Sequence, residues 1–272
     1  MRKRVAVIGA NGMLGYAVCS YFQQTARSVR SITRRDFDIA VQSFSALDNL
    51  ISDCDEVINC AGIIKPVIEH VPIESVLKVN TVFPRNLARY CLERKKLCFH
   101  ITTDCVFDGL KGCYSELDFL DANDVYGLSK AGGEPNNCMV LRTSIVGEEH
   151  TEHRSLLEWA RSQSGKRVSG FTNHYWNGLT THHLARIIEK IVHQGLYQHG
   201  TFHIFSPQTL SKFELLHLFN KIYGLELDII PVKTDTKCDR SLSSIHTLSS
   251  TLIVESIQEQ IINMRRFFLS LG

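Results

Sequence analysis

Arg4-Val5-Ala6-Val7-Ile8-Gly9-Ala10-Asn11-Gly12-Met13-Leu14-Gly15 stands near the start of the chain and decides its fold class. Residues 4–8 form a short apolar run with β-branched members, the pattern of a buried parallel strand. The glycines allow a tight turn, and helical periodicity follows over residues 12–24. Strand, glycine turn and helix in this order predict a dinucleotide-binding unit whose helix N–H groups face a pyrophosphate. A glycine-rich turn that binds nothing is the alternative.

The residues expected to bind the cofactor in this unit belong to the turn itself. The glycine spacing is Gly-x-x-Gly-x-x-Gly, which differs from the Gly-x-Gly-x-x-Gly of the commonest dehydrogenases. Glycine lets the backbone turn sharply and approach the phosphates closely. We expect the cofactor to contact Gly9, Asn11, Gly12, Met13, Leu14 and Gly15.

Strand and helix patterns alternate as far as residue 147. Strands are expected at 4–8, 29–33, 56–60, 97–102 and 138–142, with helices at 12–24, 43–52, 75–95 and 127–135. This alternation predicts an α/β fold with a doubly wound parallel sheet, a Rossmann domain over residues 1–147.

The pattern changes after Gly147. Helices are expected near 154–163, 181–193, 211–223 and 254–268, with short strands near 201–205 and 228–232. We expect residues 148–272 to form a smaller α/β part that carries the substrate pocket. The chain is expected to cross back to the first domain within it.

The choice of cofactor depends on the end of the second predicted strand. An acidic residue there binds the ribose hydroxyls of NAD, whereas an arginine accommodates the 2′-phosphate of NADP. Arg34 and Arg35 occupy this place, with Asp38 and Ile39 close enough in sequence to flank the adenine. We therefore expect NADPH, with NADH as the alternative cofactor and a solvated basic turn as the alternative to binding.

Tyr126 and Lys130 lie four residues apart in Tyr-Gly-Leu-Ser-Lys, so a helix places them on one face. A lysine ammonium beside a phenol favours the phenolate and lowers the tyrosine pKa from about 10. The pair is therefore predicted to supply a proton near neutral pH. The spacing also occurs by chance in helices, so the pair gains its meaning from the motifs around it.

Further motifs follow one another from the glycine turn to Ser144. They are Val57-Ile58-Asn59-Cys60-Ala61-Gly62, Val79-Asn80 with Pro84 and Leu87-Ala88, Thr102-Thr103-Asp104-Cys105-Val106-Phe107-Asp108-Gly109, Tyr126 to Lys130 with Gly133-Glu134, and Leu141-Arg142-Thr143-Ser144. With these motifs in this order the chain resembles the extended short-chain dehydrogenase/reductases. Within them it is most similar to the dTDP-4-dehydrorhamnose reductase group.

The resemblance implies NADPH-dependent reduction of a nucleotide-linked 4-keto-6-deoxyhexose in deoxysugar or polysaccharide biosynthesis. It assigns Thr103 to the substrate carbonyl, Tyr126 to proton donation and Lys130 to the tyrosine and the nicotinamide ribose. It also implies that the cofactor is lined by Asn80 and by Cys60, Ala61 and Gly62. A homodimer through helices on the face of the sheet is implied as well.

Substrate contacts are expected next to Thr103 and in the second half of the chain. Asp104 and Cys105 adjoin the catalytic threonine. In His174-Tyr175-Trp176-Asn177-Gly178, placed at a helix start, Trp176 and Asn177 are candidates for stacking on a base and hydrogen-bonding a sugar; a packed turn is the alternative. Arg240 is a candidate for a diphosphate, since arginine pairs well with phosphate.

Two other functions stay open. Cys105 stands where those reductases commonly have tyrosine, and where the related GDP-fucose synthases have a cysteine that works with a histidine in epimerisation. His153 is the nearest histidine candidate here, although Cys105 also fits a small buried hydrophobe. The other function is a regulatory subunit that binds NADP without turnover, as in the methionine adenosyltransferase β subunit. Retention of Thr103, Tyr126 and Lys130 speaks against that function.

The composition agrees with an ordinary globular enzyme. The chain has 272 residues, 44% hydrophobic and 21% charged, with a formal net charge of +2. This charge argues against nucleic-acid binding, and no long apolar segment suggests a signal peptide or membrane span. We expect a cytoplasmic protein. Its nine cysteines without a Cys-x-x-Cys pair indicate free thiols, and its twelve histidines lack the context of a metal site.

Overall fold

A computed structural model describes residues 3–151, 153–253 and 255–272, and its centre is a sheet of six parallel strands. The strand order is β10-β5-β4-β3-β1-β2. The strands are β1 (Arg4–Ile8), β2 (Ser28–Ile32), β3 (Glu56–Asn59), β4 (Leu97–Thr103), β5 (Met139–Thr143) and β10 (Gly200–His203). The predicted doubly wound α/β fold is confirmed. The edge strand β10 comes from the second half of the chain.

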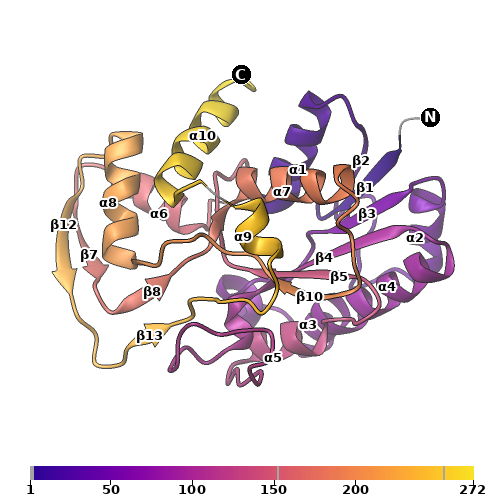
Figure 1. The fold of residues 1–272 in the computed structure, drawn as a ribbon, viewed down its shortest axis with the longest axis horizontal. Coiled ribbons are helices and arrows are strands. Elements are labelled where there is room, and N and C mark those ends of the chain that lie inside the picture. Colours follow the sequence, from indigo (N-terminus) through magenta and orange to yellow (C-terminus); the bar gives the residue numbers. More distant parts are fainter. Residues whose placement is uncertain (1–2, 152, 254) are drawn as a thin grey trace.

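Helices cover both faces of the sheet (Figure 1). On one face, α1 (Met13–Gln24) and α7 (Thr181–His193) pack against each other and against a core that includes Val7, Phe99 and Leu141. On the other face, α2 (Phe44–Ile51) and α4 (Phe83–Glu93) bury Leu47 and Leu87 against Val57 and Val140. Burial on both faces explains why a central strand such as β1 is a nearly continuous apolar run.

The helix expected at 75–95 is divided. It consists of α3 (Ile73–Leu77), a π-helical turn at Lys78–Val82 and α4. Pro84 has no N–H to donate to the carbonyl of Asn80 four residues earlier, so the helix widens there. The wide turn holds the Asn80 side chain, which is fully buried.

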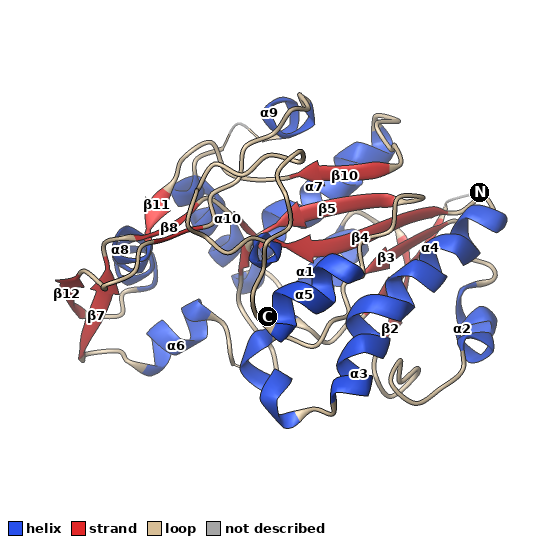
Figure 2. Cartoon of the chain, turned by 90° about the horizontal axis from the view of Figure 1, so that it is seen from below, coloured by secondary structure: helices blue, strands red, loops and turns tan. Residues whose placement is uncertain are grey.

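The remaining elements form a smaller unit beside the carboxyl ends of the strands (Figure 2). Its strand pairs are β6 (Ile145–Val146) with β9 (Leu179–Thr180), β7 (Arg167–Phe171) with β12 (Asp228–Val232), and β8 (His174–Trp176) with both β11 (Leu210–Ser211) and β13 (Cys238–Asp239). Its helices are α6 (Leu156–Ser162), α8 (Lys212–Tyr223), α9 (Leu248–Leu252) and α10 (Ile257–Leu269). Residue 254, at the start of the predicted last helix, lies outside the described residues.

Residues 174–178 were expected at the start of the helix 181–193, and the structure instead places His174–Trp176 in the strand β8. Alternation along this strand points Trp176 inward, where it joins the core shared by α6, α8 and α10. The next helix, α7, begins only after β9.

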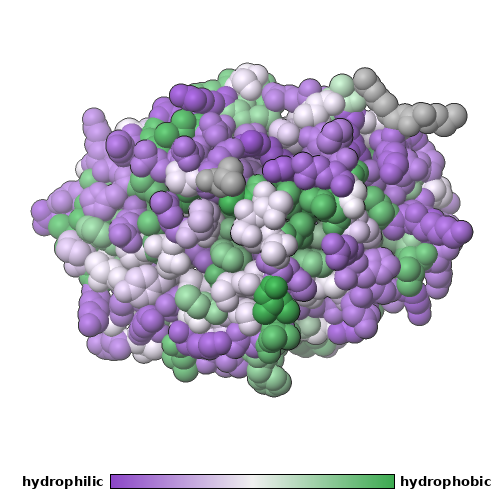
Figure 3. Space-filling view, viewed as in Figure 1, coloured by the Kyte–Doolittle hydropathy of each residue, from purple (hydrophilic) through white to green (hydrophobic). Residues whose placement is uncertain are grey.

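The surface seen in Figure 3 mixes polar and apolar side chains. All nine cysteines are free, and Cys19, Cys54, Cys91, Cys98 and Cys138 are buried. Within the described part of the chain, no helix is both long and apolar enough to cross a membrane. Among the same residues, no three histidine, cysteine or acidic side chains are placed to hold a metal ion.

Candidate active site

The glycine turn forms a close-packed cradle between β1 and α1. Gly9 has φ +80°, a conformation that favours glycine, and the N–H groups of Gly9 and Ala10 donate to the Ile32 carbonyl at 2.9 and 3.1 Å. A Cβ on Gly15 would overlap the Gly9 carbonyl, so the helix approaches the turn as closely as backbone allows. Gly12 caps α1 without a side chain, which leaves the first N–H groups open to an anion. The cradle therefore fits a dinucleotide diphosphate.

The other turn residues lie around this cradle. Leu14 is buried in the core, so only its backbone faces outward. The Asn11 carbonyl accepts from the Thr151 hydroxyl at 3.4 Å, and the Met13 side chain lies beside Gly147. The segment after β6 thus lies beside the glycine turn.

Arg34 lies just beyond the end of β2, where the cofactor choice was predicted. Its side chain is 82% exposed, and its Nε donates to Asp38 Oδ2 at 3.0 Å. Ile39 packs partly buried against the core on the α2 side. An exposed guanidinium paired with a single carboxylate among the described residues can turn toward a 2′-phosphate.

Asn80 connects the turn after β3 to α5 (Val125–Gly132). Its Oδ1 accepts from the Ile63 N–H at 2.8 Å, and its Nδ2 donates to the Ile63 carbonyl at 3.0 Å and to Ser129 Oγ at 3.1 Å. A Cβ on Gly62 would lie 3.7 Å from Lys130 Nζ. The segment from Cys60 to Gly62 therefore lies beside Lys130. Asn80 holds the two sides together, because it bonds both to Ile63 and to Ser129 of α5.

The predicted catalytic residues meet at the carboxyl end of β4. Thr103 ends this strand, and its hydroxyl interacts with the phenol of Tyr126 on α5. Gly127 makes the approach possible, because a Cβ there would overlap the Cys105 carbonyl and the Ala122 methyl. Lys130, one turn further along α5, donates from Nζ to the Ile101 carbonyl at 3.2 Å.

The start of α5 is held by Asp124, the residue just before the helix. Asp124 accepts from the Gly127 N–H at 2.8 Å and pairs with Lys65 Nζ at 2.5 Å. The aspartate cap gives a free N–H group of the first helical turn a hydrogen-bond acceptor, and it sets the direction in which Tyr126 projects.

The expectation that Lys130 lowers the pKa of Tyr126 is not met in this structure. Burial raises the pKa of the phenol, and Cys105 and Asp104 add to the rise while Thr103 opposes it. Burial also lowers the pKa of Lys130 to about 8, against the opposing effect of Glu134. Tyr126 therefore keeps its proton at neutral pH, which suits a proton donor.

A second group of charged residues borders Thr103 on the side of the smaller unit. Asp104 is buried, and burial raises its pKa despite the charges of Arg240 and Lys212. Burial raises the pKa of the Cys105 thiol to about 12, and Asp104 adds to the rise. Cys105 therefore stays protonated at neutral pH, which disfavours it as a base.

Lys212 was not predicted from the sequence. It is the first residue of α8, its Nζ lies 5.4 Å from the centre of the Trp176 ring, and its charge acts on Asp104 and Cys105. Ser211 and Glu214 form a capping box that marks the start of α8. That signal locates the start of the helix, but it does not show that Lys212 approaches Asp104 and Cys105.

The other predicted substrate residues have structural contacts. Trp176 is 3% exposed and offers no free ring face for a base, so the expectation of stacking on it is not supported. Asn177 exchanges hydrogen bonds with the backbone of Leu242 at 2.8 and 2.9 Å. Arg240 donates to the carbonyls of Phe107 at 2.8 Å and Asp108 at 3.0 Å. His153, the predicted partner of Cys105, is 62% exposed and lies 3.4 Å from Glu158.

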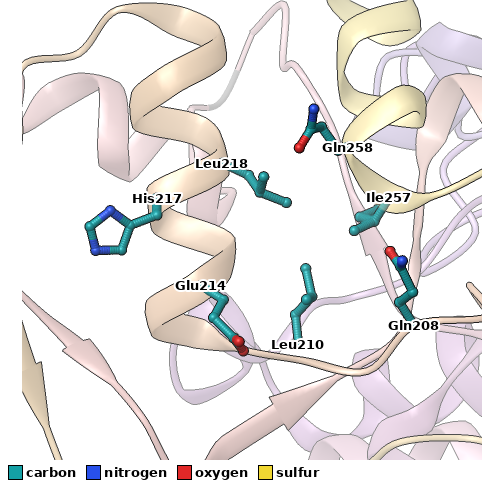
Figure 4. A pocket seen from close by; sticks show the side chains of 7 residues that line it. All are labelled: Gln208, Leu210, Glu214, His217, Leu218, Ile257 and Gln258. Atoms are coloured by element: carbon teal, nitrogen blue, oxygen red, sulfur yellow. The ribbon is translucent and has the colours of Figure 1, made fainter.

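A separate hollow of 340 Å³ lies between α8 and α10 (Figure 4). It is lined by Gln208, Leu210, Glu214, His217, Leu218, Ile257 and Gln258. None of these residues was predicted from the sequence to take part in a site, and none contributes to the arrangement around Tyr126.

Residues 3–266 match the family model described as the RmlD substrate binding domain. The chain belongs to this family. The predicted resemblance to the dTDP-4-dehydrorhamnose reductase group is thereby confirmed. The chain is 25% identical to a dTDP-4-dehydrorhamnose reductase of Aggregatibacter actinomycetemcomitans, over 94% of this chain and 92% of the relative. It is 26% identical to methionine adenosyltransferase 2 subunit beta of Rattus norvegicus, over 78% and 70% of the two chains.

The fold agrees with solved members of the group. A dTDP-4-dehydrorhamnose reductase of Bacillus anthracis in complex with NADP superposes with a TM-score of 0.81 at 21% identity. The match covers 99% of this chain and all of that one. At this identity the superposition establishes the fold.

Proposed function

We propose that this protein uses NADPH to reduce the 4-keto group of a nucleotide-linked 6-deoxyhexose. The observation that carries the proposal is the meeting of Thr103 and Tyr126 at the end of β4, with Lys130 one helical turn away beside the loop after β3. Ligands of open α/β sheets bind at this edge. The reductases named above share the family, and one of them binds NADP.

The chain's own residues hold the carbonyl and deliver a proton. A nicotinamide bound in the cradle would supply the hydride for the carbonyl carbon. Thr103 donates a hydrogen bond to the carbonyl oxygen, and Tyr126 transfers its phenolic proton to that oxygen as the C=O bond becomes C–O. The ammonium of Lys130, one helical turn away, would stabilise the phenolate left behind.

Lys212 provides the contact proposed for the substrate phosphate. Arg240, the candidate from the sequence, donates from Nε and Nη2 to the loop carbonyls of Phe107 and Asp108. The charge of Lys212 acts on Asp104 and Cys105, the two residues that follow Thr103. An ammonium is a good partner for phosphate, so Lys212→Met is expected to raise KM for the nucleotide sugar with little change in kcat.

The test is NADPH oxidation with a panel of 4-keto-6-deoxyhexoses linked to dTDP, GDP or UDP. Reduction of one member, lost in Tyr126→Phe with NADPH binding retained, supports the proposal. Binding of NADPH without oxidation on any member would favour a regulatory subunit instead. That second candidate is kept because of the similarity to methionine adenosyltransferase 2 subunit beta.

Epimerisation through Cys105 has less support, because the thiol stays protonated and His153 lies beside Glu158. Transfer of solvent deuterium to the sugar ring by the native enzyme, lost in Cys105→Ser, would restore it. A homodimer, a cytoplasmic location and a role in deoxysugar or surface glycan synthesis stay predictions.

A further inference from the structure

Two segments far apart in sequence form one wall beside the candidate site. Residues 107–116 and 238–245, here called the loop pair, run side by side (Figure 1). The Tyr114 N–H donates to the Ser241 carbonyl at 2.9 Å, and the Ser243 N–H donates to the Tyr114 carbonyl at 2.7 Å. Arg240 adds its bonds to Phe107 and Asp108. Its charge acts on Cys105 and Asp104, so this wall borders the site.

A buried polar chain connects the segment just after α5 to this wall. Glu134, four residues after Lys130, accepts two hydrogen bonds from Arg142 of β5, at 3.1 and 2.6 Å. Both side chains are buried, with 7% and 4% exposed. Arg142 Nη1 lies 2.6 Å from Nε2 of His203 on β10. His203 Nδ1 lies 3.0 Å from the Tyr114 carbonyl and 2.8 Å from the Ser243 carbonyl.

These partners define the protonation of His203. A guanidinium only donates, so Nε2 of His203 must accept from Arg142. Nδ1 then carries the hydrogen and donates to the two carbonyls, one from each segment of the loop pair. Burial and the Arg142 charge lower the pKa of His203, which agrees with a neutral ring. The ring also contacts Phe107 edge-on, with 5.9 Å between ring centroids.

We propose that His203 is a positioning residue that ties the loop pair to the Glu134–Arg142 ion pair and so sets the shape of the substrate cleft. It touches neither the reacting carbonyl nor the cofactor cradle. It acts on the wall that carries Arg240, through the carbonyls of Tyr114 and Ser243. As a statement about the reaction this rests on the proposed function, whereas the link between His203 and the loop pair stands without it.

The test compares His203→Leu with His203→Gln. Glutamine reproduces both roles, because its oxygen accepts from Arg142 and its amide donates to a carbonyl. Leucine does neither. In His203→Leu we expect amide hydrogen exchange of residues 107–116 and 238–245 to rise about tenfold, and KM for the keto-sugar nucleotide to rise by a similar factor. NADPH affinity and exchange in β1 and α1 should stay unchanged. His203→Gln should lie close to the native protein in both measurements.

Unchanged exchange in the loop pair of a folded His203→Leu variant would overturn the proposal, whatever substrate the enzyme takes. Increased exchange without any keto-sugar turnover would keep the link and count against the proposed function. If His203→Leu does not fold, His203→Phe takes its place, because phenylalanine keeps an aromatic ring and lacks both ring nitrogens. The same rise in exchange at 107–116 and 238–245 is expected there, and its absence would equally overturn the proposal.

Discussion

Replacement of Gly127 by alanine tests whether the close contact of α5 with Cys105 positions Tyr126. A Cβ at this position would overlap the Cys105 carbonyl and the Ala122 methyl. Overpacking lowers the free energy of unfolding by about 1 to 3 kcal/mol. We expect a value of about 3 kcal/mol here, because the Cys105 carbonyl belongs to the backbone and cannot rotate away as a side chain can. Alanine recovers about 1 kcal/mol of helix propensity. The net loss of about 2 kcal/mol lowers Tm by about 4 to 8 °C in a chain of this size.

The same overlap pushes Tyr126 away from Thr103. A displacement of about 1 Å at a reacting group costs about 100-fold in rate, so kcat should fall by that factor. Calorimetry and NADPH oxidation measure the two effects. Gly132→Ala is the matched control, because it lies in the same helix and its Cβ would meet only the Thr81 side chain, at 3.2 Å. Equal Tm and kcat in the two variants would refute the reasoning.

Three further predictions concern charged residues. Lys130→Met should abolish turnover yet stabilise the cofactor-free protein at pH 7 by about 2 to 3 kcal/mol, because the pKa of Lys130 is lowered to about 8. The unfolded chain holds this proton up to about pH 10.4, so native stability in urea should rise from pH 8 to pH 10, and the variant should lack that rise. Glu134→Gln should lower the free energy of unfolding, measured in urea, by about 3 to 5 kcal/mol, because Arg142 is left buried without its carboxylate. A loss no larger than that of an average surface substitution would contradict this. Arg34→Ala should raise KM for NADPH about tenfold and leave KM for NADH unchanged, and an equal change for both cofactors would exclude the 2′-phosphate contact.

Local patterns predicted the sheet well. The strand expected at 4–8 is β1, the strand at 228–232 is β12, and the helix at 181–193 is α7, each with the same bounds. These elements are determined by periodicity within their own residues. The π-helical turn could not be predicted in this way. It depends on Pro84 and on the contacts that Asn80 makes with the loop after β3 and with α5.

The candidate site was predictable where a motif carries the chemistry and not where tertiary packing decides. Thr103, Tyr126 and Lys130 belong to motifs, and the fold brings them together. Residues 174–178 were expected at a helix start, so Trp176 was predicted to meet the substrate, whereas the strand β8 turns it into the core. Lys212 was missed because its approach to Asp104 follows from how α8 docks.

The position of β10 at the edge of the main sheet bears on how the protein is made. This strand pairs with β5, and the residues between them build much of the smaller unit. During synthesis one edge of β5 therefore stays unpaired until about sixty more residues have left the ribosome. Over this interval Arg142, which is buried in the folded protein, is exposed. An open edge of this kind invites pairing with other chains. A fragment that ends at residue 147 should thus aggregate, and the nascent chain depends on chaperones or rapid elongation over this interval.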